Sequence, residues 1–98
     1  MKTPVINSKD YIVYLEEYQG LSIIHCDCFS WSKNIKKQLI TDLDVLFKIH
    51  RKHIYAIHEM EDSKHLKFIT MMGFVFNNEF IGVDKKVRHL FVRKYNGN

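Results

Sequence analysis

The sequence feature that most constrains the fold is a short segment in which a capped helix stops at a glycine and continues directly into a strand. Asp62 or Ser63 can accept a hydrogen bond from the free amides of the first helical turn. Gly73 can adopt the left-handed conformation that ends a helix, and a strand rich in aromatic residues starts at Phe74. The apolar face of this helix repeats at helical spacing, through Leu66, Ile69 and Met72. The segment predicts a helix-to-strand unit of a domain that mixes helices and strands.

Similar patterns predict the other elements. Ser32 is a good N-cap for an amphipathic helix of about four or five turns, which ends at residues 50–53. Residues 1–10 are polar and are expected to form an irregular lead-in, and Asn77-Asn78 is expected to mark a bulge. The expected strands are residues 11–15, 21–29, 54–58, 74–81 and 87–95, with turns at 16–20 and 82–86. The predicted order is β-β-α-β-α-β-β, an α+β fold with a mixed sheet in one domain over residues 1–98.

Length and composition exclude several classes of protein. With 98 residues and 46% hydrophobic residues, the chain suits one small globular domain and not a disordered one. No apolar run approaches the roughly 20 residues needed to cross a bilayer. The N-terminus lacks the apolar core of a signal peptide. We therefore expect a protein that does not act in a membrane and is not secreted through a signal peptide.

The positive charge of the chain is uneven. The net charge is +4, and residues 50–98 carry all of the excess. This bias favours an acidic partner such as nucleic acid, whereas a solvated basic face is the simpler interpretation. Basic residues interleave with aromatic ones near the end of the chain, where they can also protect an edge strand from aggregation. The candidate contacts for nucleic acid or an acidic partner are Lys85, Lys86, Arg88, Arg93 and Lys94.

Two cysteines in one predicted strand raise the question of a metal site. Cys26 and Cys28 project to the same face of a strand and could share a metal with His50 or His53. However, a single Cys-x-Cys lacks the paired spacing of a zinc knuckle, and free cysteine in a strand is usually a small buried residue. A nucleophile pair with His58 would lack an orienting group and an oxyanion donor. We therefore assign no metal ligand and no catalytic residue.

The order of elements resembles the C-terminal half of the GNAT acetyltransferase fold. Residues 21–95 are similar to that segment, and the run Phe68-Ile69-Thr70-Met71-Met72-Gly73-Phe74 is similar to the family's late-helix motif. A narrower resemblance is to small GNAT-like internal virion proteins of short-tailed bacteriophages, through Ser63-Lys64-His65-Leu66-Lys67-Phe68-Ile69. The resemblance implies a truncated GNAT-like sheet with two helices.

The resemblance also implies where a cofactor and a catalytic acid would lie. GNAT enzymes bind the pyrophosphate of acetyl-CoA with a glycine-rich loop at a helix N-terminus, and the equivalent residues here are 29–34. This stretch has no glycine; if acetyl-CoA binds, the residues that hold it are Trp31, Ser32, Lys33 and Asn34. The family's general-acid tyrosine aligns with Ile69, which cannot donate a proton, and the preceding asparagine aligns with Asp62.

These departures favour a non-enzymatic function without a cofactor. We expect a phage-type GNAT-like protein that acts as a minor virion or assembly component, or as an inhibitor of a host protein, in the host cytoplasm or the virion. Its partner would be another protein or a second copy in a homo-oligomer. The alternatives are a minimal acetyl-CoA-dependent N-acetyltransferase and a small basic nucleic-acid-binding protein.

Overall fold

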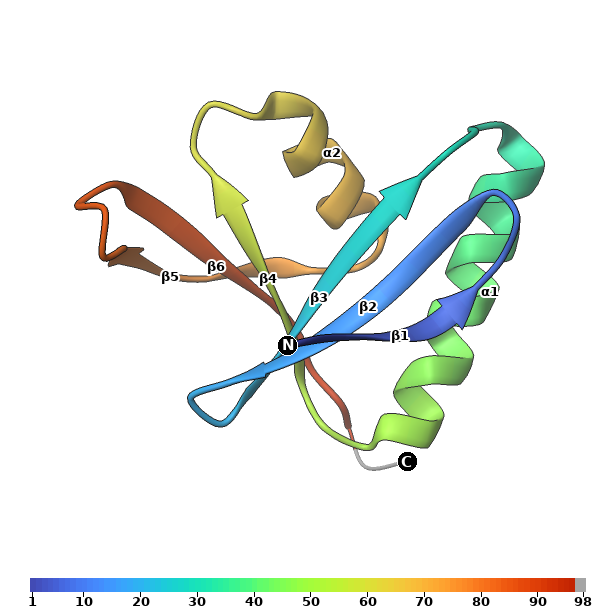
Figure 1. The fold of residues 1–98 in the computed structure, drawn as a ribbon, viewed down its shortest axis with the longest axis horizontal. Helices are drawn as coiled ribbons and strands as arrows, with labels where there is room; N and C mark the ends of the chain where they lie inside the picture. Colours follow the sequence, from blue (N-terminus) through green and yellow to red (C-terminus); the bar gives the residue numbers. More distant parts are fainter. Residues whose placement is uncertain (97–98) are drawn as a thin grey trace.

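The protein folds around one mixed sheet with two helices (Figure 1). The structure is a computed structural model and describes residues 1–96. The strands form a sheet in the order β1-β2-β3-β4-β6-β5. The described elements are β1 (Lys2–Asn7), β2 (Tyr11–Tyr18), β3 (Leu21–Cys28), α1 (Lys33–His50), β4 (Ile54–Glu59), α2 (Ser63–Met71), β5 (Val75–Ile81) and β6 (Val87–Arg93). The predicted α+β class is confirmed, with one additional strand at the N-terminus.

That additional strand corrects the irregular lead-in predicted for residues 1–10. β1 pairs antiparallel with β2 at the edge of the sheet, and its register shifts between Pro4 and Ile6. An edge strand tolerates proline because one of its sides needs no ladder hydrogen bonds. β1 is mostly exposed, so its sequence lacks the apolar alternation that would have predicted a strand.

The hairpin of β2 and β3 is longer than the sequence predicted. Residues 16–18, expected to form a turn, continue β2, and the turn is confined to Gln19 and Gly20. Both turn residues have positive φ, 51° and 80°, as required by a two-residue hairpin turn with the right-handed twist of the strands. Glu16 and Glu17 resemble turn residues in isolation, but pairing with β3 keeps them extended.

The helix signals predicted from the sequence are confirmed. The Ser32 side chain accepts a hydrogen bond from the Ile35 amide at 3.2 Å, and the Asp62 side chain accepts one from the His65 amide at 3.0 Å. Gly73 follows α2 with φ of 88°. The chain therefore turns from α2 into β5 where only glycine adopts the backbone conformation easily.

Both helices cover the same face of the sheet. The β3-α1-β4 and β4-α2-β5 crossovers run in the same direction across the sheet, and right-handed crossovers then place their helices on one side. One core joins both helices to this face, and its fully buried members include Tyr11, Leu39, Leu43, Ile54 and Ile69. The Tyr11 hydroxyl donates a hydrogen bond to Asp42 on α1. Burial and this carboxylate raise the pKa of Tyr11, so the phenol remains protonated.

The closing hairpin places β6 between β4 and β5, antiparallel to both. The predicted bulge is confirmed, because the register of β5 shifts between Phe76 and Asn78. Phe91 and Val92 of β6 are buried. Among the described residues, no helix is both long enough and apolar enough to span a membrane.

Candidate functional site

A notch opens between β3 and β4 at the centre of the sheet. These parallel strands pair only at Ser22–Ile54 and Ile23–Tyr55 and then diverge toward their carboxyl ends, as Figure 1 shows. α2 lies over the opening, and a cavity of about 210 Å³ remains between the strands and the helix. The residues around it include Ile24, Cys26, Ala56, His65, Phe68 and Met72. The notch is therefore the concave site that the fold itself creates.

The N-terminus of α1 offers free amides beside positive charge. Ser32 occupies two of the first amides, through its side chain to Ile35 and through its carbonyl to Lys36. The amides of Lys33 and Asn34 have no acceptor among the described residues, and the first turn has no acidic side chain. Lysines at a helix N-terminus oppose the helix dipole, but together with free amides they attract anions.

Trp31 connects this helix N-terminus to α2. Its ring lies 5.7 Å from the ring of Phe68, centroid to centroid, although the side chain is 49% exposed. Phe68 also lines the notch. The bulky residue in the glycine-free loop therefore forms an aromatic wall between the helix N-terminus and α2.

The notch contains no tyrosine at the position predicted for a general acid. Ile69 lies there and is 1% exposed. The titratable side chains that line the cavity are Lys2, His25, Cys26, Asp27 and His65. His25 is bonded through Nε2 to Glu16 at 2.9 Å. None of these groups is a tyrosine on α2 at the position that the resemblance implied.

The two cysteines are free, with their sulfur atoms 3.8 Å apart. Burial, and then the neighbouring Cys28, raise the pKa of Cys26, so it remains a thiol and is a poor nucleophile. His50 and His53, the candidate co-ligands, bond to Ser22 and to the Tyr95 amide. Within residues 1–96, no group of three or more His, Cys, Asp or Glu side chains is arranged to hold a metal.

Three histidines gather beside the notch, and no sequence pattern predicted them. His58 on β4 is 3% exposed, stacks on His65 of α2 with centroids 5.5 Å apart, and lies 6.4 Å from the ring of His89 on β6. Burial, followed by the charges of His65 and His89, lowers the pKa of His58. Only strand pairing brings His58 opposite His89, so no local sequence motif reveals the cluster.

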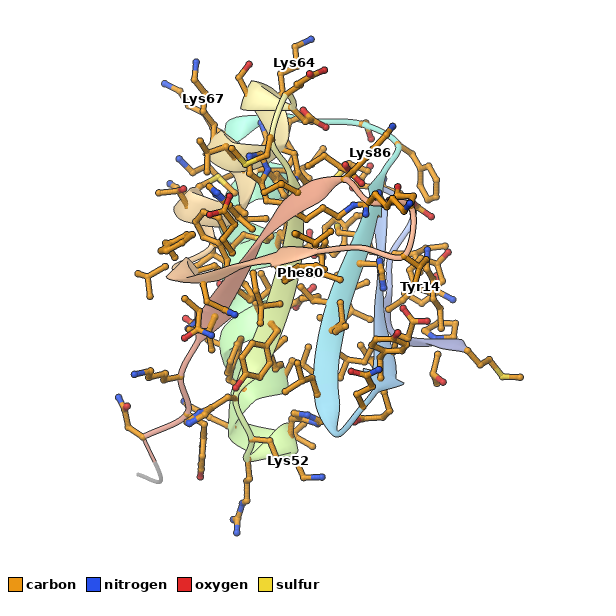
Figure 2. All side chains as sticks on the ribbon, turned by 90° about the vertical axis from the view of Figure 1, so that its left-hand side faces the viewer. Tyr14, Lys52, Lys64, Lys67, Phe80 and Lys86 are labelled. Carbon is orange, nitrogen blue, oxygen red and sulfur yellow. The ribbon has the colours of Figure 1, made fainter. Side chains whose placement is uncertain are left out.

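The basic residues proposed for nucleic acid do not form one patch. Arg88 is bonded to Asp84 and Glu59, and Arg93 to Asp44 and the Met72 carbonyl, so both charges already have partners. Arg88 and Arg93 project to opposite faces of the sheet, as the alternation of β6 predicted. Figure 2 shows other lysines near opposite ends of the molecule, with Lys64, Lys67 and Lys86 toward one end and Lys52 at the other. Lys85 and Lys86 lie in the β5–β6 turn, and Lys94 follows the far end of β6.

The face of the sheet away from both helices is uncovered. Figure 2 shows Tyr14 on this side, which we call the open face. Its side chains alternate along the strands with those of the core and include Tyr14, Tyr18, Leu21, Ile23, Tyr55, Ile57, Phe80, Leu90 and Val92. An apolar hollow of about 240 Å³ lies among Tyr18, Leu21, Ile23, Ile57, Phe80 and Leu90. Apart from Tyr18, which was expected in a turn, the sequence had assigned these residues to strands but not to one surface.

Comparison with solved structures identifies the fold. The chain is similar to a ribosomal-protein-S5-alanine acetyltransferase from Vibrio fischeri, with a TM-score of 0.69 over 88% of this chain. The fold is GNAT-like. The two sequences are 13% identical, so the likeness concerns the fold alone. The chain spans about half of that acetyltransferase, 54% of its length. The sequence matches no protein-family profile and no curated protein.

Proposed function

We propose that this GNAT-like chain is not an acyltransferase and works by binding protein. The observation that carries the proposal is Ile69, a buried aliphatic side chain at the position where the resemblance expects a proton donor. Departure of a thiolate from a thioester is assisted by such a donor, and Cys26 is a half-buried thiol without an activating base among its described contacts. The notch therefore keeps the outline of a cofactor cleft without the groups that would perform the reaction.

The open face supports the binding part of the proposal. Aromatic residues such as tyrosine are enriched in protein interfaces, and this face presents three tyrosines, of which Tyr18 lines the apolar hollow. We propose a role as a minor virion or assembly component, or as an inhibitor of a host protein. The phage assignment rests on the sequence resemblance through residues 63–69.

Isotopically labelled acetyl-CoA tests this function directly. The protein is incubated with labelled acetyl-CoA and a mixture of amine-bearing peptides and proteins, next to an active GNAT enzyme as positive control. We expect no transfer above the level without protein. Labelled acyl groups on any acceptor, lost in a heat-denatured sample, would refute the proposal.

The second candidate function is a minimal acetyl-CoA-dependent N-acetyltransferase. The observation that favours it is the pair of free amides at Lys33 and Asn34, near lysine side chains at the N-terminus of α1. Calorimetry at millimolar acetyl-CoA decides whether this helix end binds the cofactor. Binding that Lys33→Glu weakens and Lys48→Glu does not would support it, because Lys48 lies in the last turn of the same helix. If calorimetry measures no heat of binding, the acetyltransferase function is excluded.

The nucleic-acid alternative is the weakest proposal. Its support is the net charge of +4 and the excess of lysine and arginine in residues 50–98. Retention of DNA or RNA at low ionic strength, lost steeply with added salt, is the result that would revive it.

A further inference from the structure

The side chains of the open face are typical of a protein interface and not of a surface that contacts only water. Ile23 is 3% exposed and Val92 is 2% exposed, although neither α1 nor α2 covers this face. Tyr14, Tyr55, Ile57, Leu90 and Phe80 are half-buried in the same surface. Tyrosine buries large area at a small cost in side-chain entropy, which makes such a face suited to binding.

Four polar side chains of the open face are bonded in pairs, and the two that have no ion-pair partner among the described residues, Lys2 and Asp27, are opposite in sign. Glu16 is bonded to His25 at 2.9 Å, and Glu59 is bonded to Arg88 at 2.7 Å. These residues flank the apolar centre along the same strands. The face therefore does not select a strongly charged partner, although the whole chain carries +4. A neutral apolar face can bind a second copy of itself without bringing like charges together.

The two edges of the sheet are poorly suited to pairing with another chain. β1 carries Pro4 and a register shift, and β5 carries the bulge between Phe76 and Asn78. Proline and bulges interrupt the row of groups that an added strand would need. Association through the face is therefore favoured over association through an edge.

The face is large enough for a stable contact. Strands about 4.8 Å apart and about seven residues long give a six-stranded sheet a face on the order of 500 Å². A specific interface buries at least about 1,000 Å² in total, or about half of that on each partner. Covering the whole of the open face would meet this requirement.

We propose that the open face binds the open face of a second copy of this chain, in a two-fold dimer with the sheets stacked face to face. Such an interface is isologous, which means that both copies contribute the same patch. One neutral and aromatic patch of this size can therefore form the whole contact. The apolar hollow beside Phe80 and Leu90 would accept a side chain of the other copy. This inference deepens the proposed binding function by naming the partner.

Sedimentation velocity over about 1 to 300 µM protein tests the dimer. We expect a species of twice the 11.8 kDa chain mass. Ile57→Glu should raise the dissociation constant at least about tenfold, since it places a charge at the centre of the contact. Ile49→Glu is the matched control, because Ile49 is 75% exposed on α1, away from the open face. This variant should dimerise like the natural sequence.

Three results would overturn the dimer. The first is a natural protein that stays monomeric up to 300 µM, including one that binds a different protein through this face. The second is an Ile57→Glu variant that is folded by circular dichroism and still dimerises. The third is equal weakening by Ile49→Glu. If Ile57→Glu does not fold, Phe80→Glu at the rim of the hollow replaces it with the same expectation.

This test is separate from that of the proposed function. Acyl transfer by a dimeric protein would refute the non-enzymatic proposal and leave the dimer standing. A monomer without transferase activity would refute the dimer and leave the non-enzymatic proposal standing.

Discussion

The ring of Trp31 packs against the ring of Phe68 at 5.7 Å, with the ring planes inclined by 59°. This contact joins the loop before α1 to the helix that covers the notch. Since α1 and α2 are separated in the chain by a whole strand, the pair is a long-range contact that only the folded chain makes.

Trp31→Ala should therefore destabilise the protein although the residue lies on the surface. We expect a loss of about 1–2 kcal/mol in the free energy of unfolding, less than for a core tryptophan because the ring is half exposed. Urea unfolding measures it. Phe29→Ala is the control: Phe29 is 62% exposed and has no ring partner within residues 1–96, so it should change stability by less than about 0.5 kcal/mol. Equal effects of the two variants would contradict the structural role of the pair.

Tyr11→Phe should destabilise the protein by about 2 kcal/mol, because it removes the hydrogen bond from a fully buried phenol to the Asp42 carboxylate. The measurement is thermal or urea unfolding at pH 7. Tyr18→Phe, at a site 52% exposed, should be nearly neutral. If Tyr11→Phe left the free energy of unfolding unchanged, the hydrogen bond from Tyr11 to Asp42 would contribute no net stability.

The buried histidine predicts a pH dependence of stability. The pKa of His58 is lowered in the folded protein, whereas an unfolded histidine titrates near about 6.5. The unfolded chain therefore binds the additional proton first, and stability falls as the pH drops below about 6.5. His58→Phe should reduce this slope by at most about 1.4 kcal/mol per pH unit between pH 7 and pH 5.

An exposed apolar side chain on α1 supplies the control for that experiment, because changing it removes no titratable group. Ile49→Phe should keep the slope of the natural protein. Asp84 does not interfere, since the Arg88 guanidinium lowers the pKa of this carboxyl from 3.8, so the stability it adds is lost only at more acidic pH. An unchanged slope in His58→Phe would contradict the prediction.

Gly82 and Arg88 should be energetically coupled. A Cβ at Gly82 would lie 2.3 Å from Arg88 Nη1 and 2.8 Å from Asp84 Oδ1, so Gly82→Ala must displace the bidentate ion pair. We expect Gly82→Ala to cost up to about 1 kcal/mol, since an exposed ion pair contributes little more. In an Arg88→Ala background the same change should cost about 0.5 kcal/mol less, measured as a double-mutant cycle by urea unfolding. If the losses of stability in Gly82→Ala and Arg88→Ala were additive, the Arg88 side chain would move away from the added Cβ without a cost in free energy.

Local chemistry made much of this fold predictable. Ser32, Asp62 and Gly73 act within a few residues of their own positions, so the neighbouring sequence was enough to infer their roles. β1 could not be inferred in this way, because pairing with β2 and not its own apolar pattern makes it a strand. The same holds for the last residues of β2.

The candidate site was predictable only where it depended on the helix ends. The loop before α1 and the place of Ile69 followed from the resemblance. Asp84 lies only four residues from Arg88, whereas the partner Glu59 of Arg88 and the partner Asp44 of Arg93 lie 29 and 49 residues away in the chain, so these two pairs could not be inferred from spacing. The histidine cluster and the open face depend likewise on which strands become neighbours.

The brief pairing between β3 and β4 has a consequence for the motions of the molecule. Only two residue pairs join the first three strands to the other half of the sheet, whereas the two hairpins are paired along most of their length. Opening at this seam exposes few backbone amides and disrupts little of either hairpin. Among the amides of Ser22, Ile23 and Tyr55, hydrogen–deuterium exchange should therefore be faster for those that donate across this seam than for those that donate to β2 or β6, with the two halves of the sheet behaving as separate cooperative units.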